Sequence, residues 1–216
     1  MGIQERKERE KELRRNAIID AAESVIFTKG YWMTTMDDVA DAAELSKGTI
    51  YLYFKTKEEL YWAITLRGLK ILTDFFQKAY NEAETGLQKV FLMGQSFFRF
   101  SSEHPDYFNA LGYYEIKETD PAAAETVSSM CDHEGMECLD LLIRALSEGI
   151  RDGSINPEIN PGTAAVILWG QAAGVIQVMA MKGDHLQRRH GIDLSSITDD
   201  YFRFTRCFLE NKNAAR

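Results

Sequence analysis

The sequence predicts an all-α protein of about nine helices, with an N-terminal three-helix unit containing a helix-turn-helix and a larger helical domain behind it. Apolar residues recur at three- and four-residue spacing over most of the 216-residue chain, which is typical of amphipathic helices. Only four residues are proline, and no glycine- or serine-rich tract separates the two parts. We therefore expect domains at 1–56 and 57–216 that share a helix.

The first helix is predicted to end at Lys29-Gly30, where glycine takes the usual left-handed position. An apolar stripe from Ile18 to Ile26 forms its buried side. The charged segment 3–15 can extend it as a solvated rod. This segment is either a solvated terminus or an arm that follows a nucleic-acid backbone.

Two short helices follow, each with a recognisable start. Thr35 can accept a hydrogen bond from the Asp38 amide, and first-turn carboxylates suit the helix dipole, so the second helix begins at Met36. Ser46 caps a third helix over 47–54, and Ile50 and Phe54 form its inward stripe. A helix this short must be held by its neighbours.

The outward face of this third helix indicates DNA binding. Hydroxyls, aromatic rings, a cation and a glycine that permits close approach suit phosphates, thymine methyls and base edges. A further cation, Lys57, lies in the first turn of the next helix, where the dipole disfavours it unless an external anion sits nearby. The predicted DNA-binding residues are Thr35, Lys47, Gly48, Thr49, Tyr51, Tyr53 and Lys57.

The segment TTMDDVADAAELSKGTIYLYFKTKEEL closely resembles the DNA-binding signature of the TetR family of bacterial transcription regulators, from about Ala17 to Leu60. The resemblance implies an all-helical homodimer whose C-terminal domain binds a small molecule and dimerises. It implies DNA contacts for Thr49, Tyr51 and Tyr53, and a phosphate contact for Lys57. Lys47 and Gly48 occupy variable positions that help to choose the operator. The alternative is a helix-turn-helix retained only for packing.

Global charge argues against a nucleic-acid partner, because the net charge is −8 and the pI about 5.1. Residues 1–60 hold ten Lys or Arg against twelve Asp or Glu. Distribution matters more than the sum, since Lys47, Lys55 and Lys57 lie near the proposed groove face. The acidic residues Asp37, Asp38 and Asp41 can point away. We expect modest non-specific affinity for DNA.

The second domain is predicted to contain six helices separated by Gly86, Pro105, Pro121, Gly153 and a polar loop. Their expected ranges are 57–84, 87–103, from 105, after 121 to 152, 161–182 and 197–211, with a loop over 183–196.

Aromatic and methionine side chains are abundant in the middle helices. Core packing explains most of them, but adaptable thioethers and hydroxyl-tipped rings also suit a largely apolar pocket. With the family resemblance, we expect a small hydrophobic or aromatic effector to bind there. The predicted lining residues are Met93, Phe97, Tyr113, Tyr114, Met130 and Met136.

A dimer interface is predicted on the last two helices, where small residues allow close approach and the final helix offers a second apolar face. Packing of both helices within one chain is the alternative. The predicted interface residues are Gly170, Ala173, Gly174, Gln177, Phe204 and Phe208.

No catalytic triad, P-loop or dinucleotide fingerprint is present, so we expect neither an enzyme nor a cofactor. Cys131, Glu134 and Cys138 share a helical face and sit beside His133. They could bind a metal or sense oxidation, but without CxxC spacing a structural role for the thiols is favoured. The three cysteines, and the lack of a secretory signal or membrane-spanning run, suggest the cytoplasm and no membrane partner.

These observations lead us to expect a ligand-responsive, dimeric DNA-binding transcription regulator, most simply a repressor. One alternative is a DNA-bound adaptor whose C-terminal domain binds a protein partner instead of a small molecule. An enzyme with a vestigial DNA-binding unit is the third possibility. A closed apolar cavity would favour the first, and an exposed apolar patch over a filled core would favour the second.

Overall fold

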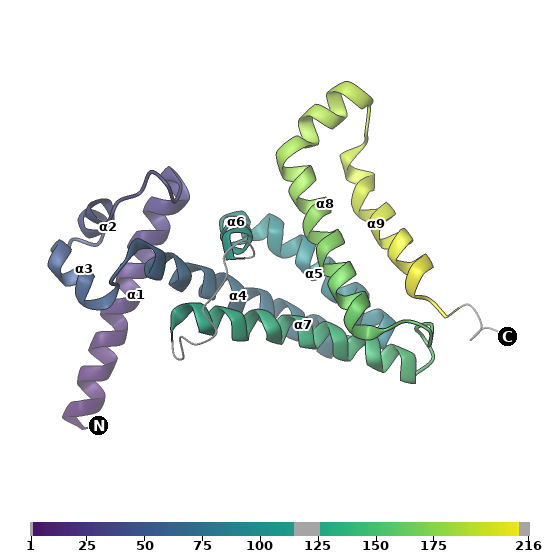
Figure 1. Cartoon of the computed structure of the whole chain (residues 1–216), viewed down its shortest axis with the longest axis horizontal. Helices are drawn as coiled ribbons and strands as arrows, with labels where there is room; N and C mark the ends of the chain where they lie inside the picture. The colour runs from purple at the N-terminus through teal and green to yellow at the C-terminus, as the bar shows by residue number, and fades with distance from the viewer. Residues whose placement is uncertain (1, 115–125, 212–216) are drawn as a thin grey trace. The chain divides into compact units, whose positions relative to one another are not determined.

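The computed structural model describes residues 2–114 and 126–211, and in this part of the chain it confirms the all-α prediction (Figure 1). Apart from one isolated bridge between Ile155 and Glu210, the described residues form no β-structure. The described residues form nine helices: α1 (Ile3–Lys29), α2 (Met36–Ala42), α3 (Lys47–Tyr53), α4 (Lys57–Glu82), α5 (Gly86–Glu103), α6 (Pro105–Tyr114), α7 (Val127–Arg151), α8 (Pro161–His190) and α9 (Leu194–Leu209).

The chain divides into two compact units. Unit 1 comprises Met1–Leu69 and Asp106–His133, and unit 2 comprises Lys70–Pro105 and Glu134–Arg216. Helices α4 and α7 therefore each contribute residues to both units. The domain boundary expected between residues 56 and 57 stays a prediction.

Unit 1 has its core where the apolar stripes of its helices meet. Ile18 of α1, Ile50 of α3, Leu60 of α4 and the capping residue Phe54 are fully buried in one cluster. Burying such a side chain contributes about 1.5–3 kcal/mol. This common core explains why the seven-residue α2 and α3 are stable although neither would persist alone.

A polar brace joins three helices of unit 1. The guanidinium of Arg67 on α4 donates to Asp20 (2.6 Å) and Glu23 (3.0 Å) on α1, and the Tyr107 hydroxyl of α6 donates to Glu23 (2.8 Å). Burial and this bond to Glu23 raise the pKa of Tyr107 to about 12. The position of α1 is thus fixed by both α4 and α6.

Unit 2 is built around a second apolar cluster that includes Met93 of α5, Leu141 of α7, Leu168 of α8 and Leu209 of α9. Helix α8 begins as predicted, with Asn160 accepting from the Thr163 amide (2.9 Å) and Pro161 in the first turn.

The predicted loop over 183–196 is wrong for most of its length. Helix α8 continues to His190, so His185 and His190 are helical, and Gly191 (φ 63°) is the left-handed cap. Gly183 does not end the helix. A Cβ there would lie 3.0 Å from Leu194, so glycine lets α9 approach closely.

The expectation that no apolar run could span a membrane is also wrong on length and composition. Helix α8 is long and apolar enough, and only 28% of its most apolar stretch is buried within the chain. A single helix of this kind is weak support for a membrane span. Its uncovered apolar surface nevertheless needs an explanation.

Candidate DNA-binding site and apolar groove

Helix α3 presents a face that the core does not use. Ile50 and Phe54 are fully buried, and Leu52 lies two residues from each, about 160° away around the helix axis. Leu52 is accordingly 75% exposed, and Tyr51 is 37% exposed. Leu52 was missing from the predicted set because a lone apolar residue suggests burial, yet its spacing from the buried pair places it outward.

Two predicted DNA contacts are less available than expected. Thr49 is half-buried, and its hydroxyl lies 2.8 Å from Ser46 Oγ. Tyr53 is also half-buried and packs against the core cluster of unit 1. Lys47, Gly48, Tyr51 and Leu52 are the exposed residues of α3. The DNA-binding roles of the whole set stay predictions.

Gly48 has no internal reason to be glycine. A Cβ built there would meet only Ser46 Oγ, at an ordinary 3.8 Å, and φ at Gly48 is not positive. Glycine inside a helix costs about 1 kcal/mol relative to alanine. No contact within the described residues therefore requires glycine at this position.

Two of the three acidic residues of α2, Asp37 and Asp38, pair with lysines instead of pointing away. Lys47 Nζ lies 2.8 Å from an Asp37 oxygen, and this partner raises the pKa of Lys47. Lys29 donates to Asp38 (2.5 Å), and that bond, with those from Thr35, lowers the pKa of Asp38 to about 2. The Thr35 hydroxyl accepts from the Asp38 amide (3.1 Å) and the Thr35 amide donates to the Asp38 carboxylate (2.8 Å). These two bonds form a capping box, so the first role of Thr35 is local.

Lys57 fixes the loop between α1 and α2. Its ammonium donates to the carbonyl oxygens of Tyr31 (2.8 Å) and Thr34 (2.9 Å) and lies 4.4 Å from the centre of the Tyr31 ring. A phosphate contact by Lys57 would add to this structural role.

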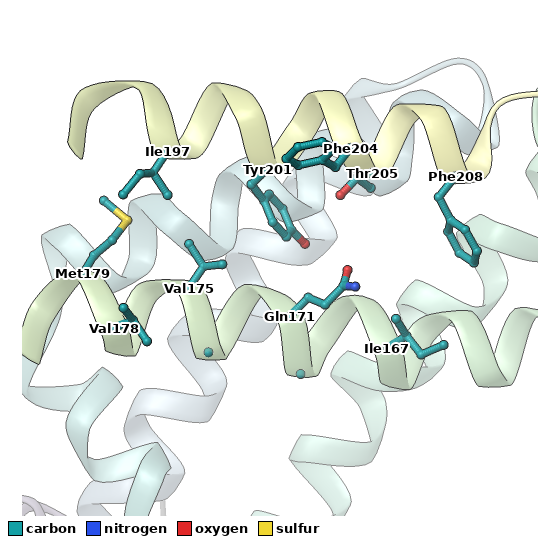
Figure 2. Close-up of a pocket in the computed structure, with 12 residues that line it drawn as sticks. Ile167, Gln171, Val175, Val178, Met179, Ile197, Tyr201, Phe204, Thr205 and Phe208 are labelled. Atoms are coloured by element: carbon teal, nitrogen blue, oxygen red, sulfur yellow. The ribbon is translucent and has the colours of Figure 1, made fainter. Parts of the chain in front are cut away.

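A second feature is an apolar groove of about 720 Å³ between α8 and α9 of unit 2. Figure 2 shows Gln171 of α8 and Tyr201 of α9 pointing toward each other across it. The Tyr201 hydroxyl donates to the Leu168 carbonyl (3.4 Å). The lining residues are Ile167, Gly170, Gln171, Gly174, Val175, Val178, Met179, Ile197, Tyr201, Phe204, Thr205 and Phe208.

The groove contains four of the six predicted interface residues: Gly170, Gly174, Phe204 and Phe208. Of the other two, Ala173 is half-buried and Gln177 is exposed. Phe204 is 74% exposed, and neither Gly170 nor Gly174 has a neighbour within 4 Å of a built Cβ. Large apolar side chains also stand exposed elsewhere on α8: Val166, Trp169 and Met181.

The predicted effector residues differ in their burial. Met93 and Phe97 are buried on α5 of unit 2, and the Phe97 ring lies 6.2 Å from that of Phe76. Met130 and Met136 are each about half exposed. The side chains of Tyr113 and Tyr114 lie outside the described part of the structure.

Two of the three cysteine residues, Cys131 and Cys138, are buried, whereas Cys207 is exposed. The Cys131 thiol donates to the Trp62 carbonyl (3.3 Å), and Cys138 lies 3.2 Å from the Thr73 hydroxyl. Burial raises the pKa of Cys138 to about 11, which keeps this thiol protonated at neutral pH. Among residues 2–114 and 126–211, no three His, Cys, Asp or Glu side chains form a metal-binding group.

Comparison with known proteins places these features in a family. The sequence profile of "Bacterial regulatory proteins, tetR family" matches residues 18–64, which include α2, α3 and the start of α4. The uncharacterized HTH-type transcriptional regulator YhgD of Bacillus subtilis is 30% identical over 158 residues, covering 72% of this chain and 78% of that protein. The HTH-type transcriptional activator FasR of Mycolicibacterium smegmatis is 29% identical over 134 residues, covering 62% of this chain but only 59% of FasR.

Among solved structures, the transcriptional regulator FadR from Bacillus subtilis in complex with stearoyl-CoA has a TM-score of 0.68 at 21% identity, covering 89% of this chain and 97% of FadR. At that identity the likeness shows the fold alone. The 30% identity to YhgD over most of its length, with the profile match across the helix-turn-helix, shows that the chain belongs to the TetR family of bacterial DNA-binding transcription regulators.

Proposed function

We propose that the protein is a dimeric, ligand-responsive regulator that represses transcription and leaves its operator when a small apolar or aromatic effector binds. The observation that supports the DNA-binding part of this proposal is the exposed face of α3. Lys47, Gly48, Tyr51 and Leu52 are exposed opposite a fully buried apolar stripe, so the helix can enter a major groove without losing core contacts.

The effector half of the proposal rests on unit 2 and on α4. Met93 is buried in the apolar cluster of unit 2, and the buried Phe97 ring lies 6.2 Å from the Phe76 ring, which packs against the same cluster. An apolar ligand could take the place of such neighbours. FadR was crystallised with stearoyl-CoA, which carries a long acyl chain, and this supports an apolar effector here. Met130, Met136, Tyr113 and Tyr114 stay predictions.

Helix α4 supplies the connection. It begins at Lys57 in unit 1 and continues into unit 2, so a ligand that displaces its C-terminal half would also move its N-terminal end. A shift of a few ångströms at that end is enough to disengage one half-site, because two recognition helices must enter successive major grooves at a fixed spacing.

A homodimer formed through α8 and α9 would explain the exposed apolar surface of these helices without a membrane. Two helices from each chain would form a four-helix interface, and the groove would receive the partner. As a DNA-bound regulator of a bacterial cell, the protein would act in the cytoplasm.

The same surface favours one alternative, the DNA-bound adaptor. An exposed apolar face on α8 could receive a different protein instead of a second copy. The two proposals differ in the mass of the purified protein in solution, since only the adaptor would be monomeric by itself.

The DNA-binding part of the proposal is tested in two steps. The full chain selects duplexes from a randomised pool, and mobility shifts then measure its affinity for the selected duplex. We expect an inverted repeat, because operator symmetry mirrors that of a dimer. Tyr51→Ala should weaken binding by about 1–3 kcal/mol without lowering thermal stability. Lys57→Ala should weaken binding similarly but also lower stability, because the loop loses its two hydrogen bonds. Unchanged operator affinity in both variants would refute the assigned reading face.

A further inference from the structure

The loop over residues 30–34 exposes two large apolar side chains in the DNA-binding unit. Trp32 is 81% exposed, more than any other large apolar side chain in the described residues, and Met33 is 75% exposed. Tryptophan is usually largely buried in folded proteins. A DNA-binding function of α3 alone does not account for either side chain.

The loop is held firmly, so this exposure is built into the fold. Thr34 is 2% exposed, and its hydroxyl donates to the Gly30 carbonyl (2.9 Å). Lys57 donates to the carbonyl oxygens on either side of Trp32 and Met33. The Trp32 ring packs edge-on against Tyr31, with ring centres 5.2 Å apart. The loop backbone and the Trp32 ring are therefore held in position, so less conformational entropy remains to be lost on binding than for a free loop.

The position of the loop indicates what it meets. Lys57 is hydrogen-bonded to the loop and also lies close to the end of α3. Helix α3 ends at Tyr53, and the four residues from there to Lys57 span at most about 14 Å. Asp38, in the first turn of α2, is already paired with Lys29. A DNA backbone beside the groove that receives α3 would thus run past the Lys57 ammonium group and past this loop. It would not meet an unpaired carboxylate at Asp38.

We propose that Trp32 and Met33 pack on the sugar-phosphate backbone of the operator beside the groove that α3 enters. The indole N–H donates to a phosphate oxygen, and the apolar surfaces of both side chains cover the adjacent deoxyribose. The inference rests on the proposed DNA binding. Two side chains are too small a patch for a stable protein partner, which needs about 800 Å² from each side.

A neutral contact of this kind has a distinctive signature. It adds affinity for any sequence, because backbone contacts carry no base information. It releases no counterion, so the dependence of affinity on salt should not change. A lysine contact also acts on all sequences, but its loss lowers the salt slope by about 1.

The test uses the duplex that the full chain selects from a random pool and a scrambled duplex of the same length and composition. Trp32→Ala should weaken binding to both by the same factor of about ten, with an unchanged salt slope. Trp32→Phe, which keeps a ring but loses the N–H donor, should fall between. Lys47→Ala is the matched control, since Lys47 is exposed on α3 and has no bond to the loop among the described residues, so its loss should reduce the salt slope while the loop stays in place.

Fluorescence gives a second measurement. In a Trp169→Phe background the remaining tryptophans are Trp32 and the buried Trp62. Adding either duplex should shift the emission to shorter wavelength as Trp32 leaves water. Unchanged affinity of Trp32→Ala together with unchanged emission would overturn the inference while leaving operator binding intact. A loss confined to the selected duplex would also overturn it, by showing base reading. Failure of the wild-type chain to bind any duplex would refute the proposed function itself.

Discussion

Replacing Gly174 by leucine should convert the proposed homodimer to monomers while each chain stays folded. A Cβ at this position meets no atom within 4 Å in the described chain, so leucine has room in the isolated subunit. Removing a helical glycine also favours the helix by up to about 1 kcal/mol. In the dimer the side chain would intrude on the partner, and overpacking costs about 1–3 kcal/mol at each of two symmetry-related sites.

Light scattering at low micromolar concentration and far-ultraviolet circular dichroism measure the two effects separately. We expect the monomer mass with unchanged helix content. Gly174→Ala is the matched control, because one methyl group should weaken the dimer less. A leucine variant that remains dimeric would place the interface elsewhere and would leave the exposed face of α8 for another partner.

The second large effect is expected at Gly48, where stability and DNA binding should change in opposite directions. Alanine fits beside Ser46 and improves helix propensity, so the free energy of unfolding should rise by up to about 1 kcal/mol. Operator affinity should fall by about 1–3 kcal/mol, because the added methyl group separates α3 from the groove.

Thermal unfolding measures the change in stability, and mobility shifts on the selected duplex measure the change in operator affinity. Gly112→Ala on α6 is the control: its Cβ also meets nothing within 4 Å among the described residues, so it should gain stability without losing operator affinity. If Gly48→Ala binds the operator as tightly as wild type, the backbone of α3 does not approach DNA closely at this position.

The helix-turn-helix was predictable because its determinants are local. Thr35 and Ser46 are hydrogen-bonded to amides three residues away, and the structure has both caps as predicted. The burial of Ile50 and Phe54 could likewise be predicted from their spacing in the sequence alone. The end of α8 was not predictable in this way, because the role of Gly183 depends on Leu194 of another helix.

Parts of the site could not be predicted from the sequence, because they also depend on residues that are distant along the chain. The bonds from Lys57 to the loop cross 23 and 26 positions of sequence, and the pairing of Lys47 with Asp37 crosses ten. Met130 and Met136 are apolar residues on a long helix, and periodicity does not show which of several faces is covered. An apolar pocket depends on contacts of this long-range kind, so its lining is the least predictable part of the chain.

The central claim is that effector and operator compete through one conformational change. Its direct measurement is the affinity of a small molecule eluted from the purified chain, titrated with and without saturating operator duplex. By linkage, operator must weaken effector binding by the same factor as effector weakens operator binding, and a coupling of about 1–3 kcal/mol corresponds to roughly 5- to 150-fold. Phe97→Ala should lower effector affinity in both titrations and leave operator affinity without effector unchanged. Equal effector affinity in the presence and absence of operator would contradict the account.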